Sequence, residues 1–333
     1  MIAPLSIPSP PLSWQSIPID LFGLHWDIRT YALIILVGII ICTIWTSRRL
    51  TKRGGEPGVV IDFLIWAVVL GLIGARLYHV FTHPHDYFYP GANLWNVFAI
   101  WEGGNAIFGS LLGGALGVFI ASKQTGVRFL SFADAVAPGL LLAQAIGRLG
   151  NYVNHELYGL PTNLPWGLQI ESTNTAYPTG LPSGTLFQPL FLYEIIWNVV
   201  GVIVLLALEK KLHWRWGKMF AGYLMWYGLG RSYLESIRID PSEYSFLGIP
   251  FNVWAAILAF VLGLVLFIVQ SRRHPGLELS VYLPGREWNR SEPAVDSFDT
   301  DSDDEDNDED DASETLESTQ ADAAATSSAA ESR

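Results

Sequence analysis

Seven long apolar stretches between residues 30 and 270 constrain the fold more than any other feature of this sequence. A helix needs about 20 mostly apolar residues to cross the hydrocarbon core of a bilayer, and each stretch is close to that length. Half of the residues are hydrophobic and only 16% are charged. The sequence therefore predicts an all-α integral membrane protein, built as a seven-span transmembrane helix bundle. The expected spans are 30–47, 58–80, 96–121, 131–150, 188–208, 218–236 and 252–270.

Lysine and arginine gather in alternate connections between these spans. They follow spans one, three, five and seven, whereas the loops 81–95 and 151–187 contain neither residue. Because basic loops stay in the cytoplasm, the pattern predicts a multi-pass protein of the cell membrane with its N-terminus outside and its C-terminus in the cytoplasm. The basic residues concerned are Arg48, Arg49, Lys52, Arg53, Lys123, Arg128, Lys210, Lys211, Arg215, Lys218, Arg272 and Arg273.

The two ends of the chain are expected to lie outside the bundle. Residues 1–29 carry five prolines before Asp20 and lack the basic start and long apolar core of a signal peptide, which indicates a short extracytoplasmic lead-in. The transmembrane domain then covers 30–272, with a small extracytoplasmic head at about 151–187. Residues 273–333 form a cytoplasmic tail.

Residues 291–333 are strongly acidic, with 16 acidic side chains and one basic side chain. Because almost no apolar residues follow Phe298, this segment cannot bury enough surface to offset its chain entropy, and disorder is expected. We interpret it as a solvated spacer, with an interaction tail as the alternative. It accounts for the net charge of −12, since the rest of the chain is close to +3.

The sequence contains no recognisable cofactor motif. Its single cysteine, Cys42, lies in an apolar stretch and excludes an intrachain disulfide or a cysteine-based metal cluster. No metal, nucleotide or nucleic-acid motif is visible, so we expect no cofactor, no metal ion and no nucleic-acid partner.

One face of the fourth span is polar near the end of that span. Arginine, asparagine and glutamate are costly at the edge of a hydrocarbon-facing helix, so the run 147–159 indicates a functional site. A guanidinium suits a phosphate because it donates two parallel hydrogen bonds. In the alternative, Arg148 pairs with Asp134 or Glu156 and is merely tolerated. The face consists of Gln144, Arg148, Asn151 and His155, at helical spacing.

The sixth span carries a second polar face, expected to look at the first across the bundle. Its alternative explanation is an ordinary i,i+4 ion pair between Arg231 and Glu235, with tyrosines as interfacial anchors. The face consists of Tyr223, Tyr227, Arg231, Glu235 and Arg238.

Two further features allow two interpretations each. Gly109, Gly113 and Gly117 recur every four residues in the third span, which favours close helix packing, with a lipid path as the alternative. Arg76 in the second span is either a snorkelling anchor or a third cation near the polar faces.

The run 147–159 resembles the signature of the bacterial prolipoprotein diacylglyceryl transferase family: Gly-Arg-x-Gly-Asn-aromatic-x-Asn-x-Glu-x-x-Gly. The resemblance extends over about residues 20 to 272 and leaves out the acidic segment. Further matches, in the same order as in the family, are Tyr31-Ala32, Gly74-Ala75-Arg76, Asp134 with Pro138, Gln188-Pro189 through Tyr193-Glu194, and Tyr227, Arg231, Glu235 and Arg238.

This resemblance implies a transferase of lipoprotein biosynthesis. Such an enzyme moves the sn-1,2-diacylglyceryl group of phosphatidylglycerol, a membrane lipid, to the lipobox cysteine thiol of a prolipoprotein, forms a thioether and releases glycerol phosphate. The residues expected to be catalytic are Arg148, Arg231, Tyr31 and Tyr227. Those expected to bind phosphatidylglycerol are Arg148, Asn151, Asn154, Glu156, Arg231, Glu235 and Arg238. Asn154 and Glu156 are also expected to hold the head over the site, with capping and turn formation as the alternative.

The chain departs from the family at the group that takes the thiol proton. Many members carry a histidine in the third span, in the context Trp-x-Gly-Gly-x-x-x-His-Gly-Gly, and Phe108 stands at that place here. Glu156, His79 or His155 are possible substitutes. Alternatively, the positive field of the arginines lowers the thiol pKa by itself.

Two other classes of protein remain open from the residues alone. An anion or lipid transporter also has several spans with intramembrane arginines, but the halves of this chain show no internal repeat and the polar residues cluster toward one side of the membrane. A membrane assembly factor without catalysis requires both arginine faces to be structural.

Overall fold

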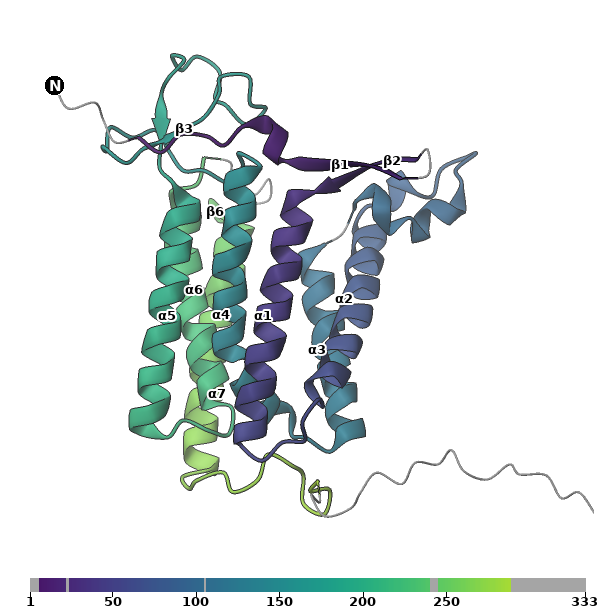
Figure 1. The fold of residues 1–333 in the computed structure, drawn as a ribbon, viewed down its shortest axis with the longest axis vertical. Helices are drawn as coiled ribbons and strands as arrows, with labels where there is room; N and C mark the ends of the chain where they lie inside the picture. Colours follow the sequence, from purple (N-terminus) through teal and green to yellow (C-terminus); the bar gives the residue numbers. More distant parts are fainter. Residues whose placement is uncertain (1–5, 22–23, 105, 240–244, 289–333) are drawn as a thin grey trace, which may run out of the picture. The chain divides into compact units, whose positions relative to one another are not determined.

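The computed structural model describes residues 6–21, 24–104, 106–239 and 245–288, and seven long helices standing side by side dominate it (Figure 1). Two helices begin directly after a proline: Pro189 precedes α5 and Pro250 precedes α7. A proline disfavours the helical conformation in the residue before it, so neither helix extends further toward the N-terminus. The helices are α1 (Thr30–Lys52), α2 (Val60–Thr82), α3 (Ile107–Thr125), α4 (Phe129–Val153), α5 (Leu190–Leu212), α6 (Lys218–Ser236) and α7 (Phe251–Arg273).

Six of these helices are long and apolar enough to cross a membrane, which supports an integral membrane protein. The exception is α6, which carries Arg231 and Glu235 in its last turns and has too low a hydropathy. It nevertheless packs against α4, α5 and α7. The sequence prediction of seven spans is thus confirmed for six helices.

The closest packing joins α2 to α3, through the glycines of α3. A Cβ atom added at Gly113 would lie 2.0 Å from the Leu70 carbonyl oxygen, and one at Gly117 would lie 2.3 Å from that of Trp66. No side chain fits there, so the two backbones approach as closely as small residues allow. Of the two interpretations of these glycines, close packing is the one that the contacts support.

The prediction of a third span at 96–121 is wrong at its start. The helix α3 begins only at Ile107, after the short 3₁₀ helices η3 (Leu94–Phe98) and η4 (Ile100–Glu102). Gly103 and Gly104 follow with φ of +90° and +68°, a backbone that no helix adopts.

Arg76 explains why this segment folds as a loop. Its guanidinium donates to the carbonyl oxygens of Val97 at 2.8 Å and Gly103 at 2.5 Å, and also to those of Asn96 and Gly104. The side chain is only 5% exposed. Arg76 therefore holds the loop 94–104 against α2, a role that neither sequence interpretation included.

Short antiparallel strand pairs lie at one end of the bundle, which we call the head end. A hairpin of β1 (Ser16–Leu21) and β2 (Leu24–Arg29) leads directly into α1, so the lead-in is more ordered than expected (Figure 1). The all-α prediction holds for the bundle but not for these pairs. The others are β3 (Leu168–Gln169) with β4 (Leu186–Phe187), and β5 (Ser245–Phe246) with β6 (Ile249–Pro250); the 3₁₀ helices η1 (Leu12–Trp14) and η2 (Pro84–Asp86) complete the elements.

The predicted head around 151–187 has its own small apolar core. Tyr158, Leu168 and Phe187 are buried together, and Phe191 at the start of α5 joins them. Ile7 of the lead-in pairs with Leu168, which ties the N-terminal segment to the head. The head therefore lies between the C-terminal end of α4 and the N-terminal end of α5.

Residues 274–288 fold back against the opposite end of the bundle, which we call the tail end. Val281 and Tyr282 are buried in a cluster with Phe63 and Val127. The Arg128 amide donates to the Val281 carbonyl oxygen at 2.8 Å. The tail predicted to begin at residue 273 thus leaves the bundle later, and the acidic segment lies outside the described residues.

Candidate active site

Arg148 and Arg231 meet at one carboxylate near the head end. Arg148 Nε lies 2.5 Å from Oε2 of Glu194, and Arg231 Nη1 lies 3.5 Å from Oε1 of the same side chain. The three residues come from α4, α6 and α5. Their side chains are 22%, 17% and 11% exposed, so the charges are largely withdrawn from solvent. Two polar faces from different helices thus converge, as the sequence predicted.

Glu235 holds Arg231 from the other side. Its Oε2 lies 2.6 Å from Arg231 Nη2, which is the i,i+4 pair foreseen from the sequence. Its Oε1 lies 3.5 Å from Arg238 Nη1 and accepts a hydrogen bond of 2.9 Å from Asn252 on α7. Glu235 is 1% exposed. A fully buried carboxylate with these partners fixes the orientation of the Arg231 guanidinium.

A hydrogen-bonded chain runs from Arg148 into the head. Arg148 Nη1 donates to Asn151 Oδ1 at 3.0 Å, and Asn151 Nδ2 donates to Glu156 Oε1 at 2.8 Å. Asn154 is the C-cap of α4 and donates to the same Glu156 oxygen at 3.5 Å. The Glu156 amide donates back to the Asn151 carbonyl oxygen at 3.1 Å. These residues therefore shape the turn that leaves α4 and brace Arg148 at the same time.

The polar faces of α4 and α6 also meet one turn further from the head. Gln144 Nε2 donates to the Tyr223 hydroxyl at 2.9 Å. The Tyr223 and Tyr227 rings stack with centroids 6.2 Å apart. Tyr227 thus lies one turn from Arg231 on the same face. The prediction that the two faces look at each other is confirmed by these contacts.

Tyr31 lies at the start of α1 against the end of α4. A Cβ atom at Gly150 would come within 2.3 Å of the Tyr31 ring, so the glycine makes room for the aromatic side chain. Gly150 lies between Arg148 and Asn151 in the chain. Tyr31 is therefore next to the polar face of α4, a neighbour that the sequence analysis did not predict.

His155 does not share the polar face of α4, and this part of the prediction is wrong. The helix ends at Val153, and His155 has a φ of +54°, which turns its side chain into the head. Its Nδ1 lies 2.8 Å from Glu171 Oε1 and its Nε2 donates to the Pro10 carbonyl oxygen at 2.8 Å. His155 therefore links the head to the lead-in.

The electrostatics of this link follow from its geometry. Burial alone would raise the pKa of the Glu171 carboxyl. The hydrogen bond and charge of His155, with hydrogen bonds from the Glu171 backbone and Asn174, together outweigh burial and hold that pKa below its usual range. Both ring nitrogens of His155 are engaged, so it is poorly suited to take a proton from a thiol.

Glu156, another group considered as a base, accepts hydrogen bonds from Asn151 and Asn154. The His79 ring stacks on His83 with centroids 4.5 Å apart. Among the described residues, neither His79 nor His155 forms a hydrogen bond or ion pair with Arg148 or Arg231. Phe108, at the family's histidine position, packs edge-on against Phe251 with centroids 5.6 Å apart.

Asp134 does not pair with Arg148, which removes one alternative explanation of this arginine. The Asp134 carboxylate is fully buried and accepts the amides of Gly217 at 2.8 Å and Phe220 at 2.9 Å. It thereby caps the first turn of α6 from the neighbouring helix.

Glu194 joins the two arginines of the candidate site, and the sequence analysis left it without a role. It lies in the first turns of α5 within a strongly apolar stretch, and an acidic residue there is itself a signal of a site. Its position between two arginines depends on how α4, α5 and α6 pack. No spacing within one helix reveals it.

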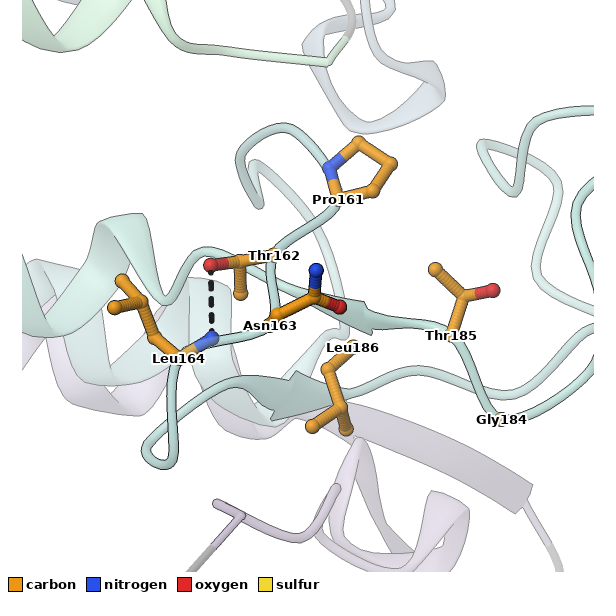
Figure 2. Close-up of a pocket in the computed structure, with 7 residues that line it drawn as sticks. All are labelled: Pro161, Thr162, Asn163, Leu164, Gly184, Thr185 and Leu186. Carbon is orange, nitrogen blue, oxygen red and sulfur yellow. Dashed lines mark hydrogen bonds between the residues drawn. The ribbon is translucent and has the colours of Figure 1, made fainter. Parts of the chain in front are cut away.

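A shallow depression of about 440 Å³ lies in the head (Figure 2). The Thr162 amide donates to the Leu186 carbonyl oxygen at 2.8 Å beneath it. The Leu164 amide donates to the Thr162 hydroxyl at 3.2 Å, the bond drawn in Figure 2. The residues that line the depression carry no charge; they are Pro161, Thr162, Asn163, Leu164, Gly184, Thr185 and Leu186.

A metal ion has no evident place in the part of the chain that the structure describes. No group of three or more histidine, cysteine, aspartate or glutamate side chains there has the geometry to hold one. The candidate site is an array of guanidinium and amide groups, which bind anions, together with carboxylates that pair with the arginines.

Comparison with known proteins gives one consistent result. A family model described as prolipoprotein diacylglyceryl transferase matches residues 19–269. The phosphatidylglycerol--prolipoprotein diacylglyceryl transferase of Leifsonia xyli subsp. xyli is 66% identical over 302 residues, which cover 89% of this chain and 90% of the relative. Proteins of the same name from Bifidobacterium longum and Paenarthrobacter aurescens are 45% and 42% identical, over 79% and 82% of this chain and 85% of each relative.

Proposed function

This chain belongs to the prolipoprotein diacylglyceryl transferase family; it is a transferase that moves a diacylglyceryl group from phosphatidylglycerol to prolipoprotein, and we propose that Arg148 and Arg231 together hold the lipid phosphate. The observation that carries the proposal is their convergence on Glu194 from two different helices. Substrate-binding arginines must approach each other to share one phosphate. The transporter and assembly-factor alternatives predict no such transfer.

The guanidinium N–H groups of Arg148 bind the protein on one side and are proposed to bind the substrate on the other. Nε is bound to Glu194 and Nη1 to Asn151, while Nη2 has no hydrogen-bond partner among the described residues. A phosphate oxygen accepts from Nη2. Arg231 is held by Glu194 and Glu235, so its guanidinium is already oriented when the lipid arrives. Such preorganised donors stabilise charge without having to move during the reaction.

Glu194 acts as a positioning residue for both arginines. Two guanidinium groups repel each other when they are partly buried, and a shared carboxylate offsets that repulsion. The phosphate then adds a second anion on the open side of the pair. Asn151, Asn154 and Glu156 brace Arg148 and supply hydrogen bonds to the glycerol head group, and Arg238 contributes further positive charge behind Glu235. Tyr31 and Tyr227 line the same region.

The reaction is a substitution at a saturated carbon. The sulfur of the lipobox cysteine attacks the carbon of the diacylglyceryl unit that bears the phosphate. A carbon–sulfur bond forms, and the bond between that carbon and the phosphate oxygen breaks. The electron pair leaves on the phosphate oxygen of glycerol phosphate, where Arg148 and Arg231 stabilise it. The product is a thioether.

The thiol must lose its proton before it attacks. An unperturbed cysteine has a pKa of about 8.5 and is mostly protonated at neutral pH. With Phe108 at the family's histidine position, the field of the two arginines lowers the pKa of the incoming thiol, and its proton passes to water.

The head end faces the outside of the bacterial cell membrane in this proposal. All basic groups named for spans one, three, five and seven lie at the tail end, because the helices that precede them run in that direction. The positive-inside rule then places the tail end and the C-terminus in the cytoplasm, with seven crossings including α6. The uncharged head depression receives the neutral residues around the lipobox (Figure 2).

The proposal is tested with purified protein in phosphatidylglycerol micelles and a synthetic lipobox peptide. A mass gain of one diacylglyceryl unit on the peptide cysteine, together with release of glycerol phosphate, is the expected result. A peptide with serine in place of the cysteine is the control. Movement of lipid without the adduct supports a transporter, and neither change supports an assembly factor.

A further inference from the structure

Three arginines surround one carboxylate at the tail end, far along the helices from Arg148. Arg49 Nη2 lies 3.0 Å from Glu209 Oε2, Arg53 Nη2 lies 2.5 Å from Oε1, and Arg215 also pairs with Oε1. Arg49 lies in the last turn of α1 and Arg53 directly follows this helix as its C-cap. Glu209 belongs to α5, and Arg215 to the connection from α5 to α6. We call these four residues the tail-end cluster.

The tail-end cluster has a surplus of positive charge in an enclosed position. The side chains of Arg49, Arg53 and Glu209 are 13%, 8% and 12% exposed, and that of Arg215 is 30% exposed. Asp134 also interacts with Arg53, and its carboxylate accepts backbone amides of α6, while Glu278 beyond Asp134 pairs with Arg128. Even with Asp134 ionised, the arginines outnumber the carboxylates. Net charge withdrawn from water is costly unless a counter-ion compensates it.

One donor of the cluster is also left without an acceptor. Arg53 Nη1 is buried and has no hydrogen-bond partner among the described residues. By contrast, Arg49 also uses its Nε, which donates to the Ala135 carbonyl oxygen at 3.0 Å. A buried donor without an acceptor is destabilising. An anion with several oxygen atoms would compensate the surplus positive charge and accept a hydrogen bond from Arg53 Nη1.

We propose that the tail-end cluster binds a phosphate group, supplied by the head group of an anionic phospholipid in the adjacent leaflet or by free phosphate. Guanidinium groups match the geometry of phosphate oxygens, and basic pockets between membrane helices at this level bind anionic head groups. Arg215 is the most exposed member and forms the mouth of the site. The anion connects α1, α5 and the start of α6. This inference does not depend on the proposed catalytic role of Arg148.

The test measures the thermal midpoint Tm of the full-length protein in phosphatidylcholine nanodiscs. One arm adds phosphatidylglycerol to the discs, and the other adds inorganic phosphate to discs of phosphatidylcholine alone. Wild-type Tm is expected to rise by about 3 °C or more in at least one arm, because a ligand that binds only the folded state stabilises it. Because phosphatidylglycerol is also proposed to bind at Arg148 and Arg231, only the part of its rise that Arg215→Gln removes identifies the lipid head group at the tail-end cluster. A rise with inorganic phosphate that Arg215→Gln removes identifies the free ion.

Two variants separate this site from the rest of the protein. Arg215→Gln is expected to lose most of the rise, whereas Lys211→Gln, which removes an exposed charge close by, keeps it. Glu209→Gln lowers the basal Tm but enlarges the anion-dependent rise, because it removes the competing carboxylate. A purely structural cluster gives only the lower basal Tm. No rise in either arm, or an equal rise in wild type and Arg215→Gln, overturns the proposal.

Discussion

Arg148 on α4 and Glu194 on α5 form an ion pair of 2.5 Å, and the second oxygen of that carboxylate faces Arg231 on α6. Three helices are thus joined at one point near the head end. The arrangement brings together two arginines that are 83 residues apart in the chain, as the proposed sharing of one phosphate requires.

Glu194→Gln should impair catalysis although Glu194 does not touch the substrate. The neutral amide no longer offsets the repulsion between Arg148 and Arg231, so we expect kcat/KM to fall about 30-fold, mainly through a higher KM for phosphatidylglycerol. The peptide-adduct assay at varied lipid content measures it. Glu194→Asp should recover part of the loss, whereas a purely structural role lowers the yield of folded protein without changing KM. Asp62→Asn, at an exposed carboxylate of α2, is the control.

The pH dependence of kcat/KM should show whether a histidine accepts the thiol proton. In the proposed mechanism the arginine field replaces a histidine base, so kcat/KM of the wild type should rise steadily with pH toward the pKa of the peptide thiol. Phe108→His should add an inflection near pH 6.5, since a neutral imidazole at this position accepts the proton. Phe108→Asn, which is polar but does not titrate in this range, is the matched control. An inflection near pH 6.5 already present in the wild type would show that another histidine is the base.

Two truncations should separate the folded part of the tail from the acidic part. A chain ending at Trp288 should keep its Tm and its activity. A chain ending at His274 loses the buried side chains of Val281 and Tyr282, and we expect it to be less stable by about 3 kcal/mol or more. Thermal unfolding monitored in detergent compares the two. A dead or unstable protein ending at Trp288 would mean that the acidic segment is needed.

Gly113→Ala tests the packing of α2 on α3. Its new Cβ atom meets the Leu70 carbonyl oxygen at 2.0 Å, so the helices must separate, at a cost of about 1–3 kcal/mol. Gly114→Ala on the same helix is the control, since its nearest neighbour lies 3.7 Å away. Equal Tm values for the two variants would contradict the close approach.

The sequence was sufficient to predict the helices and the two polar faces, because hydropathy and helical spacing are local properties. The late start of α3 was missed because Arg76 binds the carbonyl oxygens of a loop that is apolar enough to resemble a span. Glu194 had no assigned role because its pairing depends on the packing of three helices. The fold of residues 274–288 was missed for a similar reason, since two buried side chains in a polar segment give no periodic signal.

The joint action of Arg148 and Arg231 is the central claim, and a double-mutant cycle tests it most directly. Arg148→Lys and Arg231→Lys keep the charge but lose the planar fork, and each should lower kcat/KM for adduct formation by about 100-fold or more. Arg272→Lys, at an exposed arginine of the tail end, serves as the control. If both arginines hold one phosphate, the double variant should be little worse than the weaker single variant. Losses that simply multiply, or a fully active Arg148→Lys, would contradict the account.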